Sequence, residues 1–110
     1  MRLLHFSEDP SIERFDPVDK YVWAMDEEHS PLYWFPRECP RATFWPDTEP
    51  TPSQLALLGG RRRRVHAIEW AWLERMRSCE LFVYELDRAA FVHHGNGMWV
   101  SEHTVEPLGV

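Results

Sequence analysis

The chain has only two cysteines among 110 residues, and it contains no long apolar run. Cys39 and Cys79 do not form a C-x-x-C motif, and the apolar start of the chain turns acidic at Glu8, unlike a secretory segment. The other apolar runs are far shorter than the roughly 20 residues that a membrane helix needs. We therefore expect reduced thiols in a cytoplasmic protein that makes no contact with a membrane.

Basic residues are also scarce. The 12 lysines and arginines face 18 aspartates and glutamates, which gives a formal net charge of -6. This charge argues against nucleic acid as a general partner, because binding phosphates requires a basic surface. The exception is the run Arg61–Arg64, which follows two glycines. It is either an RNA or phosphate contact or, as such short runs usually are, a solvated segment.

Metal-ligand spacings are missing as well, although the chain has six histidines. The adjacent His93 and His94 point to opposite faces of a strand, and no H-E-x-x-H pattern occurs. The sequence therefore predicts no metal site, and a metal-dependent hydrolase is the weakest of the functional hypotheses.

Aromatic residues, in contrast, are abundant. They make up 14% of the chain, and six of them are tryptophans. Such side chains bury large areas in a core, and they also line ligand clefts and protein interfaces. The length predicts a single domain over residues 1–110.

The hydrophobic pattern predicts an α+β fold: a small, mixed, mainly antiparallel sheet with one long helix and one short helix. The long helix is expected over Arg63–Cys79, the short one within Asp26–Pro36, and a mobile loop over Pro46–Gly60. The expected strands are Arg2–Ser7, Lys20–Asp26, Arg37–Trp45 (either at a sheet edge or beginning only after Pro40), Glu80–Asp87 and a hairpin within Ala90–Pro107 that turns at Gly95–Gly97.

The first strand carries a histidine between apolar residues. Alternation places Leu3, His5 and Ser7 on one face and Leu4 and Phe6 on the other. The polar face indicates that His5 lines a cleft, although an ordinary sheet edge fits the same pattern.

Two further features suggest ligand chemistry. Arg37 and Arg41 flank Cys39 between two prolines, and their guanidinium groups are suited to a diphosphate or a carboxylate, or to ion pairs within the chain. Cys39 itself is expected to be a small buried filler. Glu102 alternates with apolar residues on a strand, which is typical of either an edge or a catalytic carboxylate.

Four segments together resemble an uncharacterised family of bacterial proteins over essentially the whole chain: "LLHFSEDPSIERFDP", "VWAMDEEHSPLYWFPRECPRATFW", "RRVHAIEWAWLERM" and "MWVSEHTVEPL". This resemblance implies that relatives carry a C-terminal extension that is missing here. At a greater distance, "LHFS", "VWAMDEEHSPLYW" and "WVSEHTVEP" are similar to motifs of the ADP-ribosyltransferase-like fold, whose members include NAD-using transferases and an RNA phosphotransferase.

The more distant resemblance implies NAD as the cofactor and a set of residues to hold it. His5 and Ser7 would bind the ribose and amide of the nicotinamide portion, and Tyr33 or Trp34 would stack on the ring. The late-strand carboxylate that such transferases use aligns with Gly97 or Met98, so Glu102 is the nearest substitute.

Two hypotheses therefore remain from different classes. The first is a domain that binds NAD or a related nucleotide, with ADP-ribosyl transfer as its reaction. The second is a non-catalytic protein that forms a homodimer or a partner complex through exposed aromatic residues.

Overall fold

The computed structural model describes residues 1–45, 49–59 and 64–110, which divide into two compact units. Unit 1 consists of residues 1–37 and 78–110, and unit 2 consists of residues 38–77. The predicted α+β class with mainly antiparallel pairing is confirmed, since every strand pair that the structure describes is antiparallel.

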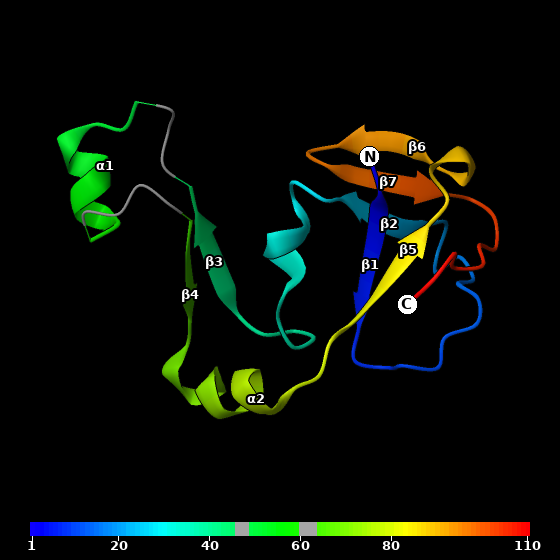
Figure 1. Cartoon of the computed structure of the whole chain (residues 1–110), viewed down its shortest axis with the longest axis horizontal. Coiled ribbons are helices and arrows are strands. Elements are labelled where there is room, and N and C mark those ends of the chain that lie inside the picture. Colours follow the sequence, from blue (N-terminus) through cyan, green and yellow to red (C-terminus); the bar gives the residue numbers. More distant parts are fainter. Residues whose placement is uncertain (46–48, 60–63) are drawn as a thin grey trace. The chain divides into compact units, whose positions relative to one another are not determined.

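Unit 1 is built on a five-stranded sheet in the order β5-β1-β2-β7-β6 (Figure 1). Its strands are β1 (Leu3–Ser7), β2 (Val22–Asp26), β5 (Phe82–Leu86), β6 (Val92–Gly95) and β7 (Met98–Ser101). Two short 3-10 helices complete the unit, η1 (Ser30–Tyr33) and η3 (Arg88–Ala90). The four strand regions predicted for this sheet are confirmed, with bounds that differ by one to a few residues.

One face of this sheet carries the hydrophobic core. Leu3 pairs with Leu86 and His5 with Tyr84 across β1 and β5, so these four side chains share a face. On β2 the core receives Val22 and Ala24, as the alternation of that strand predicts. The cluster is completed from outside these strands by Phe15, Phe91 and Val105.

The β6–β7 hairpin turns where the sequence predicts it. Asn96 and Gly97 both have positive φ angles, 53° and 76°, as a two-residue turn of type I′ requires. A register shift between His93 and Gly95 places a bulge in β6, at the edge of the sheet.

The other edge of the sheet is partly covered by the end of the chain. Glu85 on β5 donates its backbone N–H to Gly109 and accepts the N–H of Leu108. These bonds provide partners for the backbone N–H and carbonyl groups of Glu85 on the outer side of β5.

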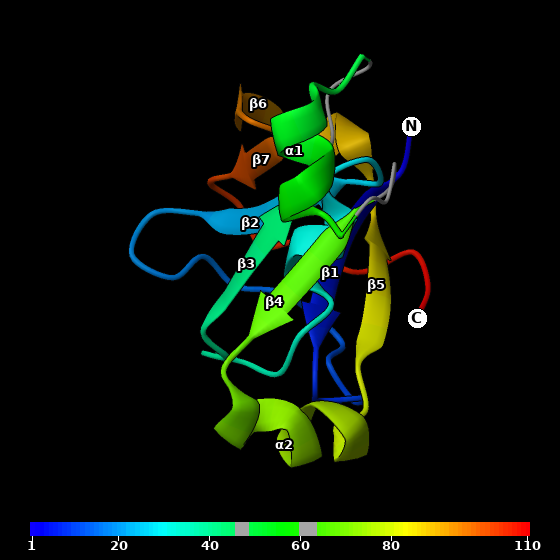
Figure 2. The same ribbon diagram turned by 90° about the vertical axis from the view of Figure 1, so that its left-hand side faces the viewer.

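Unit 2 contains a two-stranded sheet of β3 (Arg41–Phe44) and β4 (Val65–Ile68), which run side by side in Figure 2. As predicted, β3 begins directly after Pro40. The long helix expected over Arg63–Cys79 is wrong: its first part is β4, followed by η2 (Trp70–Trp72) and α2 (Leu73–Ser78). Val65 and Ile68 are β-branched, and pairing with β3 outweighs their helical spacing.

The loop prediction for Pro46–Gly60 is also corrected, because the segment contains α1 (Pro52–Leu57). Thr51 and Gln54 form a capping box: the Thr51 side chain accepts the Gln54 backbone N–H, and the Gln54 side chain accepts that of Thr51. Residues 46–48 and 60 of this segment, and Arg61–Arg63 of the arginine run, lie outside the described residues.

Candidate functional site

His5 lies on the core-bearing face of the sheet and contacts Phe15, with 4.6 Å between the ring centroids. Its Nδ1 is 2.9 Å from the Trp23 carbonyl oxygen. Because a carbonyl only accepts hydrogen bonds, Nδ1 carries the hydrogen. Burial lowers the pKa of His5. The hydrogen bond to the Trp23 carbonyl raises this pKa, and the charge of Arg37 lowers it, so the net shift is downward. The half-buried His5 thus joins two parts of the sheet as a neutral side chain.

The other residues predicted to surround the nicotinamide have separate partners. The Ser7 hydroxyl accepts the backbone N–H of Asp9 at 3.1 Å and so shapes the turn after β1. The Tyr33 hydroxyl donates to the Met98 sulfur at 3.1 Å, while the Trp34 side chain is 43% exposed. None of the contacts described for these residues places them beside His5.

The two candidate arginines fall in different units. Arg37 ends unit 1, where its backbone N–H donates to the Glu8 carboxylate at 3.3 Å. Arg41 begins β3 of unit 2 and donates to the carbonyl of Cys39 at 3.2 Å. Cys39 is buried, as its prediction as a small filler requires. Arg41 also lines a shallow hollow of about 270 Å³ with Pro40, Ala67, Ile68 and Glu69.

Glu102 follows β7 rather than belonging to a strand, which corrects the extended conformation expected for residues 102–104. The chain turns there because the Ser101 hydroxyl accepts the backbone N–H of His103. The Glu102 carboxylate is exposed and lies 3.6 Å from the ammonium group of Lys20. That ammonium group is also 5.2 Å from the centroid of the Tyr21 ring.

Tyr21 is part of an aromatic patch that the sequence reasoning did not identify, formed by Tyr21, Trp23 and His94. The Trp23 ring is 5.0 Å from His94 and 5.7 Å from Tyr21, in both cases nearly perpendicular, and Tyr21 is 5.9 Å from His94. Trp23 is 39% exposed, and His94 is also exposed. The patch lies on the sheet face opposite the core, because Trp23 alternates with the buried Val22 and Ala24.

The patch belongs to a wider apolar row across the same face. Phe6 pairs with Val83, and both Trp23 and Val92 pair with Val100. The register that joins Leu4 to Met25 aligns Phe6 with Trp23 and so connects the two halves. We refer to Val83, Phe6, Trp23, Val100 and Val92 as the apolar row.

A second missed cluster holds the turn between β2 and η1. One oxygen of the Asp26 carboxylate accepts the backbone N–H and the Nδ1 hydrogen of His29, each at 2.8 Å. This bond fixes the His29 tautomer, with Nε2 left as the proton acceptor. The imidazole lies against Gly97, where a Cβ atom would come within 2.2 Å of Nδ1.

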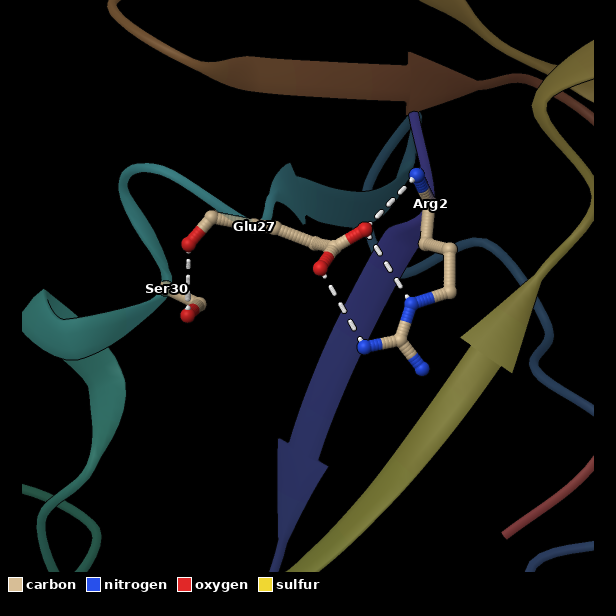
Figure 3. A network of polar contacts seen from close by, with 3 residues as sticks. All are labelled: Arg2, Glu27 and Ser30. Carbon is tan, nitrogen blue, oxygen red and sulfur yellow. Dashed lines mark hydrogen bonds and ion pairs between the residues drawn. The ribbon is translucent and has the colours of Figure 1, made fainter.

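The same turn is joined to the start of β1 (Figure 3). The Glu27 carboxylate accepts hydrogen bonds from Nε, Nη2 and the backbone N of Arg2, at 3.1 to 3.2 Å. These bonds raise the pKa of Arg2 and lower that of Glu27. The Ser30 hydroxyl donates to the Glu27 carbonyl at 2.8 Å. Since Arg2 and Glu27 are exposed, the ion pair orients the turn more than it stabilises the fold.

In unit 2, His66 is held by two neighbours. Arg64 donates from Nε to His66 Nε2 at 2.9 Å, so the hydrogen of His66 is on Nδ1, which is 2.9 Å from the Thr43 hydroxyl oxygen. Burial and the charge of Arg64 lower the pKa of His66. Arg64 is the member of the arginine run that the structure describes, and it serves here as a neighbour of His66.

The two units carry opposite formal charges. Unit 1 has five lysines and arginines against thirteen aspartates and glutamates, a net charge of -8. Unit 2 has seven against five, a net charge of +2, and the two values sum to the -6 of the whole chain. The aromatic patch therefore lies on the acidic unit.

Neither a cluster of metal ligands nor a membrane-spanning helix occurs in residues 1–45, 49–59 and 64–110. No three histidine, cysteine, aspartate or glutamate side chains in these ranges gather as metal ligands. None of the helices described combines the length and the apolar character needed to cross a bilayer.

Fold and site together define a small α+β protein with two compact units and an aromatic patch on its acidic unit. The chain belongs to a family of unknown function (DUF6886), whose model matches residues 4–110. No curated protein and no solved structure matches it. The resemblance to an uncharacterised family is thus confirmed, whereas the similarity to ADP-ribosyltransferases stays a prediction.

Proposed function

We propose that this protein is a non-catalytic interaction module that binds a partner protein through the apolar row and the aromatic patch of unit 1. The observation that carries the proposal is the exposure of large apolar side chains on one sheet face. Val92 is 67% exposed, Val83 40% and Trp23 39%, and their register places them in one row. Contiguous exposed apolar side chains are typical of interaction sites.

The identity of the exposed residues supports the same function. Tryptophan and tyrosine are enriched among residues that dominate binding energy at interfaces, because they bury large areas with few rotatable bonds. Val100 in the middle of the row is only 3% exposed and gives the surface a packed base. The neighbouring β6 is a sheet edge, and its bulge disfavours simple strand addition, so side chains are expected to make most of the contact.

The NAD hypothesis receives less support from the geometry. It requires His5, Ser7, Tyr33 and Glu102 around one pocket. Instead, His5 contacts Phe15 and the Trp23 carbonyl on the core side, and Glu102 contacts Lys20. Binding of NAD stays a prediction, and a thermal titration tests it: under the proposal made here, NAD does not raise the unfolding temperature.

Site-specific photo-crosslinking, carried out in the organism that naturally makes this protein, tests the interaction function. A photoreactive amino acid at position 92 is expected to give a discrete crosslinked product that a Trp23→Ser substitution abolishes. The matched control is position 57, where Leu57 is 87% exposed but belongs to unit 2. Equal products from both positions, or no product from position 92, would contradict the proposal. A product of twice the chain mass would identify the partner as a second copy.

A further inference from the structure

The two adjacent histidines of β6 build similar aromatic pairs on opposite faces of the sheet. His93 contacts Trp99 at 5.1 Å on the core face, and His94 contacts Trp23 at 5.0 Å on the other. Both tryptophans come from strands in the middle of the sheet, β7 and β2. The chain thus carries a histidine–tryptophan contact on each face of the sheet, with an interplanar angle of 54° on the core face and 83° on the other.

On the core face, the pair is occupied by a cation of the chain itself. The guanidinium carbon of Arg88 lies 5.1 Å from the centroid of the Trp99 ring. A cation at this distance is attracted by the negative face of the indole. The chain thus already contains one guanidinium group over a tryptophan ring that contacts a histidine.

On the opposite face, no lysine or arginine lies over the Trp23 ring within the part of the chain that the structure describes. The nearby Lys20 is over Tyr21 instead, and its ammonium group is bound to Glu102. The patch thus combines an exposed indole with a neighbouring carboxylate. Its unit carries a net charge of -8, which attracts a basic partner and disfavours a second copy of unit 1 on the same surface.

We propose that the aromatic patch of Tyr21, Trp23 and His94 binds an arginine side chain of a basic protein segment, with the guanidinium group over the Trp23 indole. Apolar residues of the same segment contact Val92 and the rest of the apolar row. This inference rests on the proposed function and specifies the chemistry of the partner. Arginine is favoured over lysine because its planar, weakly hydrated guanidinium group stacks on aromatic rings.

Calorimetry with a synthetic peptide of alternating leucine and arginine tests the proposal. The control peptide carries citrulline, which keeps the shape of arginine and removes its charge. The arginine peptide is expected to bind at least about threefold more tightly, the ratio that an exposed cation–π contact provides. Equal affinities of the two peptides would overturn the inference.

Protein variants locate the bound cation. Trp23→Leu keeps an apolar side chain and removes the indole, and it is expected to reduce the preference for arginine over citrulline to the part that the net charge of unit 1 supplies. Trp70→Leu makes the same change on unit 2, where Trp70 is 84% exposed, and is expected to keep the preference. A preference that is the same in Trp23→Leu as in the unchanged protein would overturn the assignment to this patch. Circular dichroism of both variants verifies their folding.

This experiment separates the inference from the function on which it rests. Crosslinking from position 92 without a preference for arginine would leave the interaction module standing and reject the arginine site. Preferential binding of RNA or of anionic vesicles to the patch would reject a basic protein segment as its occupant.

Discussion

Single residues in unit 1 connect loops to the sheet, and Tyr84 is the clearest case. Its side chain is completely buried on β5. The hydroxyl donates to the Asp9 carbonyl and accepts the backbone N–H of Ile12. One buried hydroxyl therefore holds the segment that follows β1.

We expect Tyr84→Phe to lower the free energy of unfolding by about 1–2 kcal/mol, because the substitution removes both hydrogen bonds that the buried hydroxyl makes to the backbone. Denaturant unfolding at pH 7 measures the loss. Tyr21→Phe serves as the control, since Tyr21 is only half-buried, and is expected to change stability by less than about 0.5 kcal/mol. A similar small change for Tyr84→Phe would show that its two hydrogen bonds contribute little.

The protonation of His5 makes stability depend on pH. Burial lowers its pKa in the folded state, so the unfolded chain binds a proton more readily. The favourable contribution is complete above the unfolded pKa of about 6.5 and is lost as the pH falls through the folded pKa. Unfolding experiments between pH 8 and pH 5 should show this decrease, and His5→Gln should reduce it.

NMR titration of the imidazole resonances tests the cause directly, with an expected His5 pKa below 6.5. His66→Gln is the matched control. Burial also lowers the pKa of His66, but His66 lies in unit 2, so this variant should leave the titration of His5 unchanged. A His5 pKa above 6.5 would contradict the account of its environment.

At the scale of secondary-structure elements, the β6–β7 hairpin depends on contact with the turn before η1. Gly97 has a φ of 76° and lies against His29. Gly59 has a similar φ of 66°, but open space surrounds the position of its missing Cβ. Comparing an alanine substitution at Gly59 with one at Gly97 therefore distinguishes the cost of backbone strain from the cost of a side-chain contact.

We expect Gly59→Ala to cost about 1 kcal/mol, because only the left-handed backbone opposes it. Gly97→Ala should cost about 3 kcal/mol, since the imidazole must also move away from Asp26. In the His29→Ala background, the cost of Gly97→Ala should fall but stay above that at Gly59, because alanine keeps the Cβ of residue 29, 2.8 Å from the added Cβ. Denaturant unfolding measures all these variants, and an unchanged cost in that background would show that His29 is not the obstacle.

The elements that the sequence predicts correctly depend on local signals. Asn96-Gly97 specifies the hairpin turn, and alternating residues in Val22–Asp26 specify the strand and the division of its side chains between two faces. The sequence also contains the capping box of Thr51 and Gln54, a local signal for α1 that the loop prediction overlooked.

The errors arise where distant residues decide the conformation. Val65–Ile68 forms a strand because Arg41–Phe44 pairs with it, and nothing within the segment Arg63–Cys79 reveals that partner. The aromatic patch of Tyr21, Trp23 and His94 likewise depends on residues that are distant in the sequence. The sequence predicts that His93 and His94 point to opposite faces, but only strand pairing brings His94 to Trp23 and Tyr21.

At the scale of the whole molecule, the two units differ in the number of apolar side chains that they bury. Unit 1 has an extended core around a five-stranded sheet. In the described part of unit 2, Cys39 and Leu58 are the buried apolar residues, and its sheet has two strands. Sheets of two strands are only marginally stable.

We therefore expect backbone amides of β1, β2 and β7 to exchange with deuterium at least about 100-fold more slowly than those of β3 and β4. Hydrogen exchange followed by mass spectrometry resolves both segments. Equal protection would mean that unit 2 receives stabilisation that its own packing does not supply.

The charge difference between the units bears on how a partner approaches. Acidic unit 1 attracts basic segments toward the aromatic patch, and unit 2 has the opposite sign. Raising the salt concentration should therefore weaken binding of the arginine peptide mainly by slowing its association, whereas the citrulline peptide should be nearly insensitive.

The indole N–H resonance of Trp23 tests the central claim most directly. During an NMR titration with the arginine peptide, this resonance should shift and reach saturation while the indole resonance of Trp70 stays in place. If the Trp23 resonance does not move, or if both resonances move alike, the aromatic patch of unit 1 is not the binding site.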